Sequence, residues 1–198
     1  LGVLLLEPPP GTGECAFDST RRVFEQRMHL FPTLRRRLVQ GPMQIGDPHW
    51  IDDPCFDLDA HLLRSTLPAP GSMRQLEEFV GSYASKLLDR RKALWELVLV
   101  EGLEGGRLAA VSKFHHAAMD GGRLVALVGQ LFDMSAEPVD VSPPSEPWVP
   151  DREPSIPWLA ADTVRTLLGK PRRAARAAAA VATSFAGRAL AQHSRTED

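Results

Sequence analysis

The stretch LWELVLVEGLEGGRLAAVSKFHHAAMDGG, residues 94–122, decides the fold. It contains two apolar runs, 94–100 and 108–114, which are separated by a turn rich in glycine. Two such runs around a short glycine-containing turn are typical of a β-hairpin. The second run leads directly into His115 and His116, and an apolar pattern with helical spacing resumes after the following Asp-Gly-Gly. The sequence therefore predicts that the two histidines lie at a strand-to-helix junction.

The composition bounds the class of protein. The chain has 198 residues, of which 43% are hydrophobic and 24% charged, which suits one domain with a real core, with or without an appendage. A net charge of −2 gives no whole-chain signal for nucleic-acid binding, because that requires a basic excess. No apolar run approaches the roughly 18 residues that span a bilayer. Residues 1–6 also lack the basic flank of a signal peptide, so we expect any membrane contact to be peripheral.

Cysteine usage and the first residue add two expectations. Cys15 and Cys55 are too few for a disulfide framework, so we expect two reduced thiols in a cytoplasmic protein, with a single bridge as the alternative. The chain begins at Leu1, inside an apolar run and without a methionine. We therefore expect that the chain is a fragment whose natural N-terminus lies upstream.

Local patterns predict the remaining elements. Residues 1–6 form a short apolar run, which predicts a buried strand. Helical periodicity predicts one helix over 18–31 and a second one after Ser72, where Gln75 completes a capping box. Residues 41–70 are polar and rich in proline, and they predict irregular structure.

Two charged clusters have more than one interpretation. Residues 35–37 are three consecutive arginines, for which a solvated face is the main interpretation and binding of phosphate or an acidic partner the alternative. Four aspartates precede His61 in the irregular segment: Asp52, Asp53, Asp57 and Asp59. Such aspartates usually bond to their own backbone in turns, and a metal site is the alternative.

The histidine pair and the residues that follow it form the candidate site. A histidine with a pKa of about 6.5 can take a proton from a hydroxyl group at neutral pH if it is held neutral and aimed, and His116 is placed to do so. Asp120 lies within one tight turn of it, where it can anchor the loop by pairing with an arginine or with backbone N–H groups. Gly121 and Gly122 permit backbone conformations that other residues resist.

Other chemistries fit the same residues less well. A zinc or iron site would need a third ligand at metal-like spacing, and adjacent histidines on a strand end point in opposite directions. A purely structural pair in a buried polar network is a further alternative. A serine hydrolase would need a G-x-S-x-G elbow, which the sequence lacks. The remaining interpretation of these residues is general-base catalysis, in which the nucleophile is a bound substrate.

The segment HHAAMDG, residues 115–121, matches the HHxxxDG signature of the CoA-dependent acyltransferase superfamily. Its surroundings resemble the N-terminal half of the bacterial wax ester synthase/diacylglycerol acyltransferase family. Five segments occur in the order of that family: FPTLRRRL (31–38), PHWIDDPCFDLDAHL (48–62), the LP-PG step (67–71), LLDRRKALWELVLVEGLEGGR (87–107) and KFHHAAMDG (113–121).

This resemblance implies a fold and an organisation. The fold would be α/β, one lobe of a chloramphenicol acetyltransferase-like fold with a mixed sheet flanked by helices. Residues 1–137 would form the N-terminal acyltransferase lobe, 138–157 a Pro-rich connector, and 158–198 a basic, Ala-rich helical segment leading to a missing second lobe. For that basic segment, contact with an anionic membrane surface is the alternative to a connector helix.

The resemblance also implies a reaction. His116 would be the general base for transfer of a fatty acyl group from acyl-CoA to diacylglycerol or a long-chain alcohol, which gives triacylglycerol or wax ester. His115 would be a motif residue of the catalytic site, Asp120 a structural partner that shapes the loop, and Gly121 a structural residue of the motif. Acyl-CoA would be a substrate, with no cofactor and no metal. We expect a cytoplasmic location with peripheral contact to the inner membrane or lipid droplets.

Some features depart from the family. Residues 93–95 read Ala-Leu-Trp where the family usually has Pro-Leu-Trp, and 122–124 read Gly-Arg-Leu after the motif. The second half of the family, which supplies the other wall of the substrate channel, is absent from the sequence. Two alternatives therefore stay open. One is a truncated, non-catalytic lobe that acts as a half-enzyme or an interaction module, and the other is an acyltransferase with a different acceptor.

Overall fold

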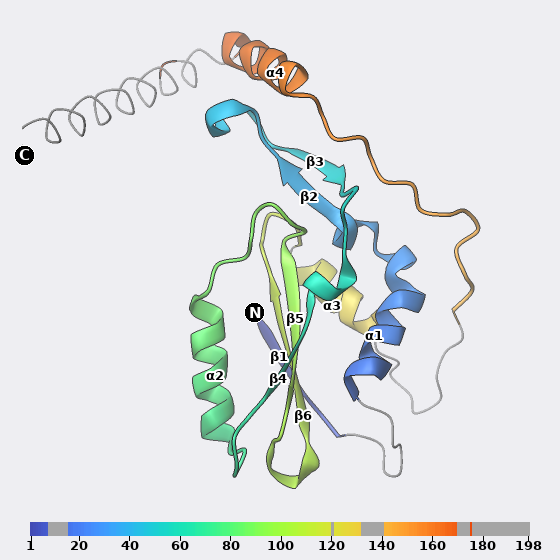
Figure 1. Cartoon of the computed structure of the whole chain (residues 1–198), viewed down its shortest axis with the longest axis vertical. Helices are drawn as coiled ribbons and strands as arrows, with labels where there is room; N and C mark the ends of the chain where they lie inside the picture. The colour runs from blue at the N-terminus through green and yellow to red at the C-terminus, as the bar shows by residue number, and fades with distance from the viewer. Residues whose placement is uncertain (8–15, 120, 132–140, 170–174, 176–198) are drawn as a thin grey trace, which may run out of the picture. The chain divides into compact units, whose positions relative to one another are not determined.

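The computed structural model describes residues 1–7, 16–119, 121–131, 141–169 and 175 (Figure 1). Its strands are β1 (Gly2–Leu6), β2 (Arg36–Val39), β3 (His49–Asp52), β4 (Leu62–Thr66), β5 (Trp95–Glu101) and β6 (Leu108–Phe114). Its α-helices are α1 (Ala16–Arg27), α2 (Met73–Ser85), α3 (Gly121–Leu131) and α4 (Ile156–Gly169). Backbone contacts divide the chain into two units, Leu1–Arg37 with Ile51–Asp151 and Leu38–Trp50 with Arg152–Asp198.

A four-stranded sheet in the order β1-β6-β5-β4 forms the centre of the first unit. Strands β5 and β6 pair antiparallel, which confirms the predicted hairpin. Strand β1 pairs antiparallel with β6, whereas β4 pairs parallel with β5. The sheet is therefore mixed, and the predicted α/β class with a mixed sheet flanked by helices is confirmed.

The two faces of this sheet carry separate cores, because successive strand residues point to opposite faces. Figure 1 shows α2 on one side of the sheet and α1 and α3 on the other. The core on the α2 side contains Leu67, Leu76, Tyr83, Val98, Val100, Leu103, Ala109 and Val111. The other core contains Phe24, Met28, Leu34, Leu62, Ala93, Trp95, Leu97, Met119, Leu127 and Leu131.

Trp95 organises the second core at the start of β5. Its ring stacks on Phe24 at 5.6 Å and on His61 at 4.8 Å between ring centroids. Its indole N–H donates a hydrogen bond of 2.7 Å to the carbonyl oxygen of Leu34. In the sheet, Trp95 lies opposite Phe114, the last residue before the histidine pair. A rigid aromatic cluster thus fixes the strand end from which the candidate site begins.

Helix α2 begins as predicted. The Ser72 hydroxyl accepts a hydrogen bond from the Gln75 amide, and the Gln75 side chain accepts one from the Ser72 amide, so the capping box is confirmed. The helix runs from Met73 to Ser85. Leu76 and Tyr83 are its buried residues.

Three sequence-based expectations are corrected. Residues 2–6 form a strand, but it is not buried: Leu4 and Leu5 are 40% and 47% exposed, because β1 lies at the edge of the sheet. The segment 41–70 is not wholly irregular, since it contains β3 and β4, and β4 joins the main sheet. The helix predicted over 18–31 begins at Ala16 and ends at Arg27, where a 3₁₀ turn, η1 (Met28–Leu30), replaces it.

The second unit contains α4 and the turn η3 (Pro42–Gln44). The imidazole of His49 lies 2.8 Å from the Asp162 carboxylate and packs edge-on against Trp158. The Thr163 hydroxyl donates a hydrogen bond of 3.0 Å to the carbonyl oxygen of Ile45. Helix α4 begins at Ile156, inside the segment 138–157 that was predicted as connector. Of the arginines and lysines in the basic segment 158–198, Arg165 alone lies among the described residues, and it pairs with Asp162.

Candidate active site

The histidine pair lies in a single turn between β6 and α3, as the sequence predicts. Strand β6 ends at Phe114, and the His115 amide still donates a hydrogen bond of 3.0 Å to the Leu94 carbonyl. The His115 carbonyl then accepts hydrogen bonds from the amides of Ala118, at 2.9 Å, and Met119, at 3.2 Å. The Met119 side chain is buried in the second core, so the turn is held at both ends.

The two imidazoles have different surroundings. The Nδ1 atom of His115 accepts a hydrogen bond of 3.1 Å from the Ala117 amide, which places the ring proton on Nε2 and fixes the ring within its own turn. His116 is exposed, and within the described part of the chain no hydrogen bond restrains its ring. His116 is therefore the imidazole of the pair that is available to a bound hydroxyl group.

Two other predicted site residues have different outcomes. Asp120 lies outside the described residues, so its predicted anchoring of the loop stays a prediction. Gly121 is the exposed first residue of α3, without a left-handed φ and with free space where a Cβ would lie. The conformational freedom predicted for glycine here is therefore not used at Gly121.

A buried lysine, missed by the sequence analysis, fixes the end of β6. Lys113 is only 8% exposed, although it is a charged residue next to an open turn. Its ammonium group donates hydrogen bonds to the carbonyl oxygens of Tyr83, at 2.6 Å, and Lys86, at 2.8 Å. These carbonyls belong to the C-terminal end of α2, where carbonyl oxygens lack partners within the helix and attract cations. Lys113 therefore joins α2 to the strand that carries the histidines.

Tyr83 and Glu96 extend this network. The ammonium group of Lys113 lies 3.9 Å from the centroid of the Tyr83 ring. The Tyr83 hydroxyl donates a hydrogen bond of 2.6 Å to the Glu96 carboxylate. Burial, and then the hydrogen bond to Glu96, raise the pKa of Tyr83 well above its usual range, so this hydroxyl is protonated at neutral pH. Glu96 lies opposite Lys113 in the sheet, which closes the network across β5 and β6.

Arg27 is a second buried basic residue, and it binds the C-terminal end of α3. The guanidinium group of Arg27 donates hydrogen bonds of 2.9 Å and 3.0 Å to the carbonyl oxygens of Gln130 and Leu131. Both carbonyls are at the C-terminal end of α3, the helix that follows the histidine turn. Helices α2 and α3 thus both end on a buried basic side chain.

Two of the four aspartates near His61 bond to the local backbone, whereas Asp52 pairs with Arg36 and Asp59 with Arg21. Asp53 accepts a hydrogen bond from the Cys55 amide and Asp57 one from the Asp59 amide, which confirms that these side chains bond to the local backbone. His61 is buried between Phe56 and Trp95, and it hydrogen-bonds the Trp95 carbonyl through Nδ1. Burial is the main cause of its lowered pKa, so it is a neutral core residue. Among the described residues, no group of histidines, cysteines and carboxylates has the arrangement of a metal site.

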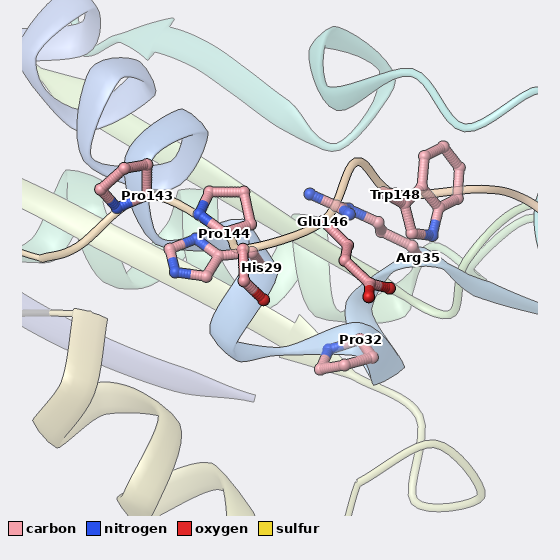
Figure 2. Close-up of a pocket in the computed structure, with 8 residues that line it drawn as sticks. His29, Pro32, Arg35, Pro143, Pro144, Glu146 and Trp148 are labelled. Atoms are coloured by element: carbon pink, nitrogen blue, oxygen red, sulfur yellow. The ribbon is translucent and has the colours of Figure 1, made fainter.

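The three consecutive arginines are divided between ion pairs and a pocket. Arg36 pairs with Asp52 at 2.9 Å and Arg37 with Asp53 at 3.0 Å. Arg35 instead packs over the Trp148 ring at 4.8 Å. It lines a pocket of about 580 Å³ together with His29, Pro32, Pro143, Pro144, Ser145, Glu146 and Trp148 (Figure 2). The solvated face predicted for this run is therefore only partly correct.

No helix among the described residues has the length and apolar character needed to cross a membrane.

Comparison with known proteins identifies the family. Residues 1–197 match the wax ester synthase/diacylglycerol acyltransferase catalytic domain. A Mycobacterium tuberculosis protein named as a diacylglycerol O-acyltransferase is 34% identical over 171 residues, which are 86% of this chain and 62% of that protein. Another protein of the same organism and name is 36% identical over 155 residues, which are 78% of this chain and 32% of that protein.

A solved structure is similar to this chain and belongs to the same family. The wax ester synthase/diacylglycerol acyltransferase from Marinobacter aquaeolei VT8 superposes with a TM-score of 0.51 and 30% sequence identity, over 64% of this chain and 31% of that one. The chain thus spans about a third of one of these two mycobacterial relatives and about three fifths of the other. Because the family match extends over nearly the whole sequence, the chain belongs to the wax ester synthase/diacylglycerol acyltransferase family.

Proposed function

We propose that this chain supplies the catalytic histidine for acyl-CoA-dependent acylation of diacylglycerol or a long-chain alcohol. One observation carries the proposal: in a chain of this family, His116 is an exposed imidazole without a fixed partner among the described residues, on a turn held at both ends. A reactive group on such a turn can face a substrate without being mobile.

The chemistry needs only a base and a good leaving group. The imidazole of His116 removes the hydroxyl proton of the acceptor, and the oxygen attacks the thioester carbonyl of acyl-CoA. The tetrahedral intermediate collapses with cleavage of the carbon–sulfur bond, and the proton passes to the departing CoA thiolate. No covalent enzyme intermediate and no cofactor is required, because a thiolate leaves readily. His115 and Asp120 are proposed to shape the turn, and Gly121 is the first residue of the helix that follows it.

A second lobe is part of this proposal. Some relatives are about three times longer than the matched region, so the other wall of the substrate channel is proposed to come from a further segment of the family chain. Lipid acceptors also favour peripheral contact with a cytoplasmic membrane or a lipid droplet. The alternative is that this lobe is a half-enzyme or interaction module without turnover of its own.

The test is release of free CoA from palmitoyl-CoA with dioleoylglycerol or hexadecanol as acceptor. The chain is assayed alone and mixed with the C-terminal half of a longer family member. His116→Ala, His116→Gln and His115→Ala are compared in both settings, and circular dichroism checks that each variant is folded. Loss of a general base is expected to lower kcat by ~10² to 10⁴ in both His116 variants. His115→Ala is expected to cost less, since His115 bonds to its own turn.

Each outcome has a distinct meaning. Turnover that depends on the acceptor and is lost without His116 supports the proposal and shows the preferred acceptor. Turnover only after mixing supports a site shared between two lobes. If folded protein releases no CoA in either setting, or if His116→Ala is as active as the parent, the catalytic proposal is wrong and the interaction module is favoured.

A further inference from the structure

The pocket around Arg35 has no part in the proposed chemistry of the histidine turn. One wall comes from His29, Pro32 and Arg35, in the turns η1 and η2 (Pro32–Arg35). The facing wall is the extended segment 143–148, from which two prolines, Glu146 and Trp148 line the space (Figure 2). A volume of about 580 Å³ lies within the usual range for sites of small molecules.

The facing segment belongs to the same unit, and Asp151, on the C-terminal side of Trp148, bonds to β3. The Asp52 amide donates a hydrogen bond of 2.8 Å to the Asp151 carboxylate, and the Asp151 amide donates one of 3.1 Å to the Asp52 carbonyl. Arg35 packs over the Trp148 ring in the same region. These contacts hold the extended segment beside the pocket, so both walls exist before any ligand binds.

Arg35 differs from Arg36 and Arg37 in the hydrogen bonds of its side chain. Arg36 and Arg37 each bond to an aspartate, whereas the guanidinium group of Arg35 meets no hydrogen-bond acceptor among the described residues. It is nevertheless half-buried, and burial lowers its pKa, with only a partial opposing effect from Asp52. An arginine carries five N–H donors in a planar fork that fits phosphate and carboxylate oxygens.

We propose that this pocket binds a small molecule with a phosphate group on a flat apolar body. Arg35 would hold the phosphate, and the proline rings and the Trp148 indole would pack on the body. Nucleotides have this chemistry. If the proposed function is correct, one source is the nucleotide end of CoA, and in that case the pocket contributes to the binding of acyl-CoA.

Two other polar side chains, Glu146 and His29, line the pocket and affect the binding of an anionic ligand. Glu146 is labelled among the lining residues in Figure 2, and its negative charge disfavours an anionic ligand. His29 lies on the wall that carries Arg35, and its imidazole can donate a hydrogen bond to such a ligand. Glu146 is exposed, so its charge is partly screened by solvent and does not abolish binding. Removing that charge should tighten binding, so substitutions of Glu146 and Arg35 should have opposite effects on affinity.

The experiment is isothermal titration calorimetry of the chain with four probes. Adenosine 3′,5′-bisphosphate and CoA carry both required parts, adenosine lacks the phosphate, and inorganic phosphate lacks the flat body. We expect the first two to bind and the last two to bind at least about tenfold more weakly. Arg35→Gln should weaken the binding of adenosine 3′,5′-bisphosphate at least about tenfold, and Glu146→Gln should strengthen it. The control Arg74→Gln removes one exposed positive charge on α2 and should change nothing.

Several results would overturn the proposal. They are absence of binding for all probes, binding that survives Arg35→Gln, and inorganic phosphate binding as tightly as the bisphosphate. Binding of the bisphosphate but not of CoA would assign the pocket to a free nucleotide. This test is independent of turnover: the pocket can bind in a protein that lacks acyltransferase activity, and turnover that depends on His116 can persist if the pocket is empty.

Discussion

The ammonium nitrogen of Lys113 lies 2.6 Å from the carbonyl oxygen of Tyr83, at the end of α2. This contact joins the C-terminal end of α2 to the second-last residue of β6, the strand that leads into the histidines. It also leaves a charged group buried, which is tolerated only because two carbonyls and an aromatic face surround it.

Lys113→Met should destabilise the fold. The substitution keeps the length of the side chain but leaves two helix carbonyls without their charged donor, which should lower the free energy of unfolding by about 2–3 kcal/mol. Urea denaturation followed by circular dichroism measures the change. Lys92→Met serves as the control, because Lys92 is exposed and should cost less than about 0.5 kcal/mol. Equal stability of the two variants would show that the buried contacts contribute nothing.

Tyr83 is the only tyrosine of the chain, so its ionisation can be followed by ultraviolet absorbance. Its pKa is raised above the ordinary value of 10.0, so the folded chain should show no phenolate signal at about pH 11. The neutral form stabilises the fold fully below the unfolded-state pKa, and this contribution is lost as the pH rises above it. Glu96→Gln removes the half-buried negative charge beside the hydroxyl and should bring the titration to lower pH. A phenolate signal near pH 10 from folded protein would contradict the prediction.

His61 should make stability fall in acid. Burial lowers its pKa below the ordinary 6.5, so its neutral form is favoured in the folded chain. The contribution of His61 is therefore complete above about pH 6.5 and is lost as the pH falls below that value. His61→Gln keeps a polar side chain that can bond the Trp95 carbonyl but cannot titrate. Unfolding free energies at pH 7 and pH 5 should differ less in this variant than in the parent, and an unchanged difference would count against the assignment.

Two glycines with nearly the same backbone angle should differ in their tolerance of alanine. Gly71 has φ +73° and Gly105 has φ +74°, so both substitutions carry the cost of about 1 kcal/mol for left-handed backbone. A Cβ at Gly71 would also overlap the carbonyl oxygen of Gly102, whereas at Gly105 it would meet open space. Gly71→Ala should therefore destabilise the chain by at least about 1 kcal/mol more than Gly105→Ala. Thermal melts of the pair test this difference.

Local signals in the sequence predicted the elements that depend on neighbouring residues. The hairpin of β5 and β6 follows from two apolar runs around a glycine-rich turn, and α2 follows from the pair Ser72 and Gln75. The location of His115 and His116 followed from the same reasoning. The family assignment rested on longer segments in a fixed order, and the match over residues 1–197 confirms it.

The features that were missed depend on distant parts of the chain. Strand β4 is short and lies in a polar segment, and it is a strand because its residues pair with β5. A lysine at position 113 has the appearance of a solvent-facing strand residue, and only the end of α2 makes it buried. The apolar run of β1 gives no sign of being at the sheet edge, because an apolar pattern does not show which face is covered.

The order of the sheet has a consequence for how the chain folds. Strands β5 and β6 are close in sequence, but Gly2 of β1 pairs with Ser112 of β6, across almost the whole lobe. Closing a loop of that length is slow compared with forming a hairpin, so β1 should join last. During synthesis, β1 leaves the ribosome well before β6, and its apolar residues are open to chaperones until β6 follows.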